Sequence, residues 1–249
     1  MAKNTILSVQ GVTKVFGAKP ALAGIDLDIY EGEVLALLGV NGAGKTTLSS
    51  ILATLHPATT GDVQYHGASI YKNLIRYRKD LGYCPQHPNL DTMLTVRDNL
   101  IFAGRYFVMP QKTIIERTNR LMEQFGLMVY AQATVQSLSG GYQQRLSIAR
   151  ALMHDPKVVI LDEPTVGLDP HIRRQLWEVI KELKAHGITV ILTTHYLDEA
   201  EALADRVCIM HRGKILLIET LAALKEKHEK KRFEDIFIEL TKNEQNGGS

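Results

Sequence analysis

The segment Gly39-Val-Asn-Gly-Ala-Gly-Lys45-Thr46 constrains the fold of this chain more than any other feature of its sequence. It has the spacing GxxxxGK[ST], follows a short apolar run at residues 33–38, and precedes a helix predicted over residues 45–55. Glycines let successive backbone N–H groups turn inward around phosphate oxygens, and a helix N-terminus adds a partial positive charge. A plain glycine turn would not require the Lys45–Thr46 pair. We therefore predict a phosphate-binding cradle in which Lys45 reaches the β- and γ-phosphates and Thr46 ligates Mg²⁺.

Short apolar runs alternate with helical stretches along the chain, which predicts an α/β fold with a mainly parallel sheet. Central strands are expected at residues 33–38, 158–161 and 188–192, because these runs are rich in Val, Ile and Leu and are bounded by polar or turn residues. Residues 6–9 and 22–29 alternate between apolar and polar side chains, which indicates a small antiparallel layer near the N-terminus.

The middle of the chain, from about residue 88 to residue 153, has helical periodicity and no convincing strand. Val96, Leu100 and Ala103 repeat at helical spacing behind Thr95, which is placed to cap their helix. We predict that 88–153 is a helical subdomain inserted into the α/β core. The core would then be a domain over residues 1–220, and residues 221–249, rich in Lys and Glu, would form a charged C-terminal tail.

Composition excludes several classes of protein. The net charge of +2 argues against a general nucleic-acid binder, which usually carries a strong basic excess. Cys84 and Cys208 lie far apart, which excludes a disulfide scaffold or a cysteine-based zinc site. No apolar run approaches the roughly 18 residues of a membrane-spanning helix, so the chain is not expected to cross a membrane by itself.

Two carboxylates end the apolar segment Lys157-Val-Val-Ile-Leu-Asp162-Glu163. Neighbouring strand residues point to opposite faces, so Asp162 and Glu163 are expected to have different roles. We assign Asp162 to Mg²⁺, through water, and Glu163 to orienting and deprotonating an attacking water. The alternative is a pair of carboxylates at a surface strand end. The apolar run should instead carry both to the sheet edge that holds the cradle.

Gln86 and His195 are predicted to complete this site. Gln86 follows Tyr83-Cys-Pro in a loop, where it could contact both metal and water, although a loop glutamine alone is usually just solvated. His195 follows the strand predicted to end at Thr194, which places it at the same sheet edge. A lone histidine is more often structural, but this position favours contact with the γ-phosphate.

The segment Leu138-Ser-Gly-Gly-Tyr-Gln-Gln-Arg145 predicts a second anion-binding end. The Ser139 hydroxyl, free backbone amides and a helix N-terminus can together hold a phosphate, although many ordinary helices also begin with serine. This end lies in the helical insert, whereas the cradle lies in the α/β core. If both bind phosphate, the simplest geometry encloses each nucleotide between two copies of the chain arranged head to tail.

Taken in order, these segments resemble the ATP-binding subunit of ABC transporters over about residues 5–220. LSGGYQQR is similar to the family signature LSGGQ, with Tyr142 in place of glutamine. GVNGAGKTT resembles the Walker A segment and VVILDEP the Walker B segment. Gln86 corresponds to the Q-loop, Gly167-Leu168-Asp169 to the D-loop and His195 to the switch histidine.

The resemblance implies a RecA-like P-loop NTPase core and a dimer that ATP closes and hydrolysis reopens. Phe16, in Lys-Val-Phe-Gly, corresponds to the aromatic residue that stacks on adenine, and Asp169 is also placed to cap a helix. The predicted ATP contacts are Phe16, Gly39, Asn41, Gly42, Ala43, Gly44, Lys45, Thr46, Thr47, Ser139, Gly140, Gly141 and Asp169. The predicted catalytic residues are Glu163, His195 and Gln86, and the predicted Mg²⁺ ligands are Thr46, Gln86 and Asp162.

The same resemblance implies the partners. Membrane permease subunits would supply the spanning part, and residues from about 74 to 107 would form the groove that receives their coupling helices. The second ATP-binding subunit is expected to be an identical chain, and the assembly to lie at the cytoplasmic face of the inner or plasma membrane. The ending Phe233-Glu-Asp-Ile-Phe-Ile-Glu-Leu resembles that of exporter ATPases, so export is the expected direction.

Three other classes share parts of this pattern. DNA-repair and chromosome-organising ATPases insert long coiled coils or zinc modules, and ribosome-associated ATPases usually carry two such domains in one chain. The near-neutral charge disfavours both, and no nucleic acid is expected as a partner. A small-molecule kinase could share the cradle but has no need for LSGGYQQR.

Overall fold

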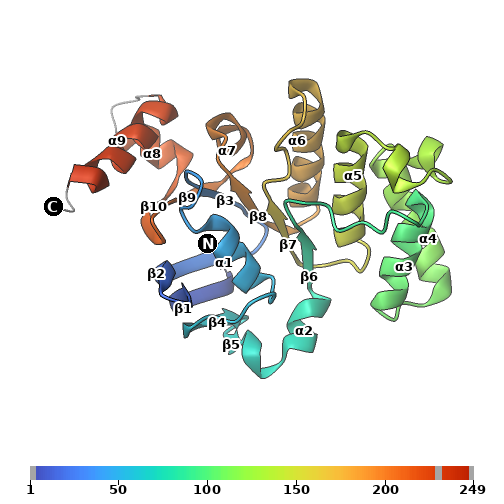
Figure 1. The fold of residues 1–249 in the computed structure, drawn as a ribbon, viewed down its shortest axis with the longest axis horizontal. Coiled ribbons are helices and arrows are strands. Elements are labelled where there is room, and N and C mark those ends of the chain that lie inside the picture. The colour runs from blue at the N-terminus through green and yellow to red at the C-terminus, as the bar shows by residue number, and fades with distance from the viewer. Residues whose placement is uncertain (1–3, 228–231, 247–249) are drawn as a thin grey trace.

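Two β-sheets form the body of the molecule, and the helices lie mainly beside the larger sheet (Figure 1). The computed structural model describes residues 4–227 and 232–246. The first sheet is antiparallel, in the order β2-β1-β4-β5. Its strands are β1 (Thr5–Phe16), β2 (Lys19–Tyr30), β4 (Thr60–Tyr65) and β5 (Ala68–Ser69). This is the small antiparallel layer predicted near the N-terminus.

The second sheet has the order β10-β9-β3-β8-β7-β6 and is parallel except for the β9–β10 pair. Its strands are β3 (Val34–Leu38), β6 (Leu81–Cys84), β7 (Val158–Asp162), β8 (Thr189–Thr194), β9 (Arg206–His211) and β10 (Lys214–Thr220). Every residue of β3, β7 and β8 is buried. This explains why the strands are continuous apolar runs in the sequence.

The two faces of this sheet pack against different layers. In β7, Val158 and Ile160 belong to a core that includes the antiparallel sheet and helix α1 (Lys45–Leu52). Val159 and Leu161 belong to a core formed with the helices of the middle segment and with α6 (Pro170–Ala185). Because successive side chains of β7 point to opposite faces of the sheet, this one strand contributes to both cores. Helix α1 ends at Leu52 and not at residue 55 as expected, because Thr54 adopts a left-handed backbone (φ 60°).

The middle segment between β6 and β7 is helical, as predicted, and lies at one end of the molecule (Figure 1). Its helices are α3 (Val96–Tyr106), α4 (Gln111–Gln124) and α5 (Gly140–Ala151), with short 3₁₀ turns at Met128–Tyr130 and Val135–Ser137. The Thr95 hydroxyl accepts a hydrogen bond from the Asp98 amide at 3.0 Å, which confirms the predicted cap of α3. The remaining short helices are Ile70–Lys72, α2 (Leu74–Lys79) and α7 (Leu197–Leu203).

The C-terminal helices α8 (Leu221–Lys227) and α9 (Phe233–Asn246) lie at the opposite end of the molecule from α3 and α4 (Figure 1). Leu224, Phe233 and Ile236 are buried in one cluster with Ala36 and Leu38 of β3, so apolar contacts anchor this charged segment to the sheet. Part of the Lys/Glu-rich run, residues 228–231, lies outside the described residues. The division of the chain at residues 220 and 221, and the limits 88–153, stay predictions.

Across residues 4–227 and 232–246, no helix combines the length and the apolar character that crossing a membrane requires.

Candidate functional site

The glycine-rich loop joins the end of β3 to the start of α1, and at Gly39 and Gly44 it has no room for a larger side chain. A Cβ atom on Gly39 would lie 2.5 Å from the Met210 carbonyl oxygen. Gly44 has a left-handed backbone (φ 107°), and a Cβ there would lie 2.8 Å from Leu22 Cδ2. Gly42 is also left-handed, at φ 82°. The loop is thus held against the β9 end and β2, which fixes a curved backbone at the N-terminus of α1.

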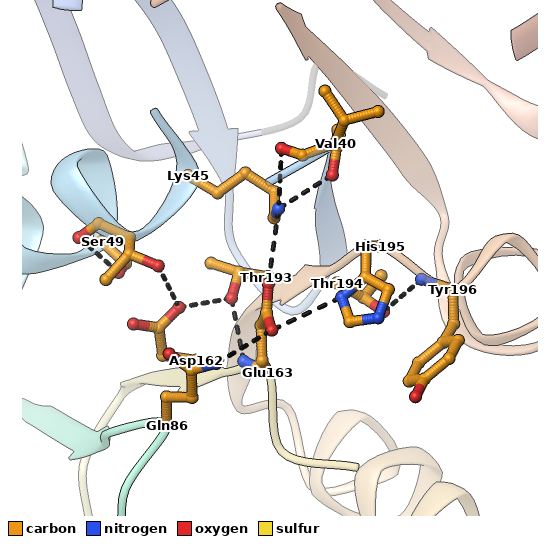
Figure 2. Close-up of polar contacts among 12 residues, drawn as sticks. Val40, Lys45, Ser49, Gln86, Asp162, Glu163, Thr193, Thr194, His195 and Tyr196 are labelled. Carbon is orange, nitrogen blue, oxygen red and sulfur yellow. Dashed lines mark hydrogen bonds and ion pairs between the residues drawn. The ribbon is translucent and has the colours of Figure 1, made fainter. Parts of the chain in front are cut away.

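Lys45 extends from the first turn of α1 into the loop. Its buried Nζ donates to the carbonyl oxygens of Gly39 at 2.8 Å and Val40 at 3.4 Å (Figure 2). The same ammonium lies 3.4 Å from Glu163 Oε1. A buried ammonium needs such partners, and here they all lie around the loop predicted to bind phosphate.

Asp162 ends β7 and is 1% exposed. Its Oδ1 accepts hydrogen bonds from the hydroxyls of Thr46, at 3.4 Å, and Thr193. In the described part of the chain, Oδ2 is buried and has no hydrogen-bond partner. Burial raises the pKa of Asp162, although the hydroxyls of Thr193 and Ser49 oppose the rise. A carboxylate oxygen without a partner beside the Thr46 hydroxyl fits a hard cation such as Mg²⁺, which prefers oxygen ligands.

Glu163 is the meeting point of the predicted catalytic residues. Its Oε2 accepts a hydrogen bond from Gln86 Nε2 at 3.1 Å and lies 3.4 Å from His195 Nδ1, while Oε1 faces Lys45 (Figure 2). Asp162 faces hydroxyls and Glu163 faces nitrogen groups, so the two carboxylates have different surroundings. Loop, strand end and helix thus bring three predicted residues, Lys45, Gln86 and His195, together around the Glu163 carboxylate.

The backbone of Glu163 is left-handed, with φ 48°. This conformation costs a non-glycine residue about 1–3 kcal/mol and persists only where surrounding contacts impose it. Here the Glu163 amide donates to the carbonyl oxygen of Thr193 at 3.1 Å and to the Thr193 hydroxyl at 2.9 Å. The strained turn aims the carboxyl group away from the strand and toward Gln86 and His195.

Thr193 was missed by the sequence reasoning. Its hydroxyl donates to Asp162 and accepts from the Glu163 amide, so it organises both carboxylates. A signal was available, since Thr193 lies two residues before His195 at the end of the strand predicted to reach the same sheet edge. A threonine in an apolar run is ordinary strand composition, and for this reason the signal was weak.

The predicted second anion-binding end is separate from this cluster. Ser139 and Asp169 occupy the N-cap positions of α5 and α6 and are exposed, yet within the described residues neither side chain makes a capping hydrogen bond. The side-chain capping expected for Asp169 is therefore not observed. Gly141 is needed for close packing, because a Cβ there would lie 2.8 Å from Ile172 of α6. No hydrogen bond or ion pair among the described residues joins either side chain to Lys45 or Glu163.

Phe16, at the end of β1, is 49% exposed. Lys14 Nζ lies 5.0 Å from the centre of its ring, and the His56 ring meets it edge-on at 6.1 Å. The ring is thus available to a planar ligand. The remaining predicted ATP contacts, Asn41, Ala43 and Thr47, lie in the cradle itself, where Asn41 is exposed and Ala43 is buried.

Comparison with known proteins matches residues 22–166 to the family described as ABC transporter. Nod factor export ATP-binding protein I of Rhizobium sp. (strain N33) is 42% identical over 222 residues, which cover 89% of this chain and 73% of that protein. The protein of the same name from Rhizobium meliloti (strain 1021) is 43% identical, and the match covers 85% of this chain and 64% of that protein. ATP-binding cassette sub-family A member 2 of Homo sapiens is 41% identical over 212 residues, but these are 9% of its length.

Solved structures agree with this match. An ATP-binding subunit of an ABC transporter superposes with a TM-score of 0.85 at 28% identity, covering 95% of this chain and 99% of that chain. A dimeric ATP-binding cassette in a post-hydrolysis state, bound to ADP and Pi, superposes with a TM-score of 0.79 at 28% identity, covering 86% and 98%.

Fold and site together define a P-loop ATPase: a mainly parallel sheet with an antiparallel layer, a helical insert, and a phosphate cradle beside two strand-end carboxylates. The chain belongs to the ABC transporter family, as an ATP-binding subunit that hydrolyses ATP. The predicted fold class, family and ATPase function are confirmed. The roles of the individual site residues stay predictions.

Proposed function

We propose that two copies of this chain close around two ATP molecules, that hydrolysis reopens them, and that this cycle drives export through membrane permease subunits. The observation that carries the proposal is the convergence of Lys45, Gln86 and His195 on Glu163, beside the unpartnered oxygen of Asp162. Phosphoryl transfer requires a positioned nucleophile and charge neutralisation, and this cluster contains groups suited to both.

Glu163 is assigned to orienting and deprotonating the attacking water. The Gln86 amide donates to its Oε2, and the His195 ring is close to the same oxygen, so the carboxylate is held from two sides. Lys45 is assigned to the β- and γ-phosphates, and His195 to the γ-phosphate. A carboxylate fixed in this way can accept a proton from a water without having to reorient.

Thr46, Asp162 and Gln86 are the residues that would hold Mg²⁺. The fit rests on the Thr46 hydroxyl, 3.4 Å from Asp162 Oδ1, and on the buried Oδ2 of the same carboxylate. When bound, Mg²⁺ supplies neutralisation of the charge on the phosphate oxygens. Because Mg²⁺ usually keeps several waters and few protein ligands, contact of Asp162 through water is compatible with this set.

Ser139 and Gly140 are assigned to the γ-phosphate bound by the other copy. Both are exposed at the N-terminus of a 12-residue helix, and the serine hydroxyl makes no capping bond within the described residues. A helix N-terminus with an uncommitted hydroxyl can receive an anion. A dimeric ATP-binding cassette bound to ADP and Pi shares this fold, which supports the pairing of two copies.

Ser139→Arg tests the shared site. The added side chain should block closure while the cradle still binds ATP, so ATP binding is expected at parental affinity and hydrolysis at a small fraction of the parental rate. Ser137→Arg is the matched control, because Ser137 is also exposed two residues earlier and its hydroxyl bonds the Thr134 carbonyl. Hydrolysis by Ser139→Arg at the rate of the control would contradict a site shared between copies.

The permease is proposed to dock in a groove of 680 Å³ between α2, α3 and the end of α5. Large apolar side chains stand exposed along it, with Phe102 at 58% and Tyr106 at 77% exposure, whereas Tyr77 of α2 lies in the core. Exposed apolar surface of this kind marks an interaction site. The Nod factor export proteins among the relatives favour an exporter, whose ATPases would lie at the cytoplasmic face of the membrane.

Phe102→Glu tests the docking groove. A charge in the groove should reduce recovery of the chain with its permease subunits from detergent extracts, because a carboxylate would be buried at the interface. Val129→Glu, at an exposed position of the helical segment outside the groove, should leave recovery unchanged. Equal recovery of both variants would place the permease elsewhere on the chain.

A further inference from the structure

Glu199, on helix α7, is completely buried at 0% exposure, although it is not among the residues gathered at Glu163. Its Oε1 accepts a hydrogen bond from Trp177 Nε1 of α6 at 3.0 Å. The hydroxyls of Thr165 and Thr194 face the same carboxyl group. Glutamate is almost never fully buried unless it is paired, and among the described residues Oε2 has no hydrogen-bond partner, so this burial requires an explanation.

The partners of Glu199 belong to the two segments that carry the proposed catalytic groups. Thr194 directly precedes His195, and its hydroxyl accepts a hydrogen bond from the Tyr196 amide at 3.0 Å (Figure 2). This bond joins the residues on either side of the histidine. Thr165 lies two residues after Glu163, and its carbonyl oxygen accepts from the Leu168 amide at 3.2 Å in the turn that leads to α6. The carboxyl group of Glu199 therefore lies between these two segments.

A second connection joins the same two helices. Arg173 of α6 donates from Nη2 to both carboxylate oxygens of Asp198, at 3.1 and 3.0 Å, and its guanidinium lies 4.1 Å from the centre of the Tyr196 ring. Asp198 is exposed, so this pair is expected to contribute little. The buried Trp177–Glu199 bond carries the larger cost of disruption, because its loss leaves a polar group without a partner.

We propose that Glu199 is a positioning residue for ATP hydrolysis: it fixes the segment of His195 against residues 165–169, which lead into α6. This inference rests on the roles proposed above for His195 and Asp169. Helix α6 begins directly after Asp169, and α7 begins directly after Tyr196. A contact that the second copy makes at Asp169 would therefore act, through Glu199, on the position of His195. The His195 Nδ1 atom lies 3.4 Å from Glu163 Oε2.

The carboxyl group can fill this role in its neutral form. Burial raises the pKa of Glu199, although the nearby threonine hydroxyls and the hydrogen bond from Trp177 oppose the rise. A neutral acid accepts from Trp177 through one oxygen and can donate to a threonine hydroxyl through the other. Glutamine has the same shape and the same donor and acceptor, so it should replace Glu199, whereas leucine should not.

The test compares Glu199→Leu with Glu199→Gln in the full chain, with rates normalised to bound ATP. We expect Glu199→Leu to lower kcat about tenfold, which corresponds to about 1.4 kcal/mol in the barrier, at an unchanged KM for ATP. Glu199→Gln should stay within about twofold of the parent. Glu201→Gln is the matched control, because Glu201 is on the same helix but exposed and paired with Lys225.

Parental kcat in Glu199→Leu would overturn the inference, and so would equal losses in the leucine and glutamine variants. If Glu199→Leu does not fold, Trp177→Phe decides, since it removes the N–H donor and keeps the ring. It should lower kcat by a few-fold at unchanged KM, and parental kcat would overturn the inference. His195→Ala, measured in the same assay, distinguishes failure of the Glu199 inference from failure of the proposed function. Parental hydrolysis in His195→Ala would remove the proposed role of His195 itself.

Discussion

Two regions of the molecule are proposed to bind phosphate: the cradle edge of the central sheet and the N-terminal end of α5. They differ in how many of their polar side chains have partners within the chain. At the sheet edge, Lys45, Asp162 and Glu163 already have partners within the chain. At the end of α5, Ser139 is exposed and, among the described residues, its hydroxyl caps nothing. In the proposed shared site, folding assembles one half, and the other half would be completed by a second copy.

The difference follows from what each region is built on. The sheet edge lies at the ends of strands that are buried on both faces, so the core fixes the positions of its side chains. The end of α5 is held by packing of Gly141 against Ile172 and by hydrogen bonds from Gln143 Nε2 to the carbonyl oxygens of Val135 and Leu138, so its exposed Ser139 is not fixed by a core on both sides. Disrupting the first region should therefore affect a single copy of the chain, whereas disrupting the second should affect only the closed pair.

The largest expected effect on a single copy comes from Lys45→Ala. Saturating Mg-ATP typically adds about 4 kcal/mol of stability at 1,000 times its dissociation constant. Lys45→Ala should lose most of this stabilisation, because the ammonium at the cradle is removed. Lys157→Ala is the control, since Lys157 is exposed at the other end of β7. Equal shifts in melting temperature for the two variants would contradict the cradle assignment.

A smaller effect is expected from Thr193→Val, which keeps the shape of the side chain and removes the hydroxyl shared by Asp162 and Glu163. Loss of these bonds should cost about 1–3 kcal/mol in the free energy of unfolding, measured with urea, and should also lower kcat. Thr189→Val is the matched control. Its buried hydroxyl accepts from the Gly32 amide at the far end of the same strand, so stability should fall while kcat is retained. If the two variants lost kcat equally, Thr193 would not organise the site.

Much of the fold was predictable from the sequence because it depends on local patterns. The apolar runs at β3, β7 and β8 correspond to strands, and Thr95 caps α3 as expected. The cradle was predictable for the same reason, since its spacing is local. From the ends of the predicted parallel strands it also followed that Asp162, Glu163 and His195 should meet at one edge.

The features that were not predictable depend on contacts between distant segments. The left-handed backbone of Glu163 is imposed by Thr193, which is thirty residues away in the sequence. The burial of Glu199 depends on Trp177 of another helix. Leu224 and Phe233 are covered by the sheet although they flank a strongly charged stretch, and composition alone indicated a solvated tail. No single-segment pattern contains this information.

The molar mass of Glu163→Gln in saturating Mg-ATP tests the central claim most directly. This variant should bind ATP and hydrolyse it at least about 100-fold more slowly, because the general base is removed. Light scattering should then give the mass of two chains, whereas Glu163→Gln combined with Ser139→Arg should give the mass of one. If Glu163→Gln stays monomeric with ATP bound, even together with the permease subunits, a nucleotide site shared between two copies is contradicted.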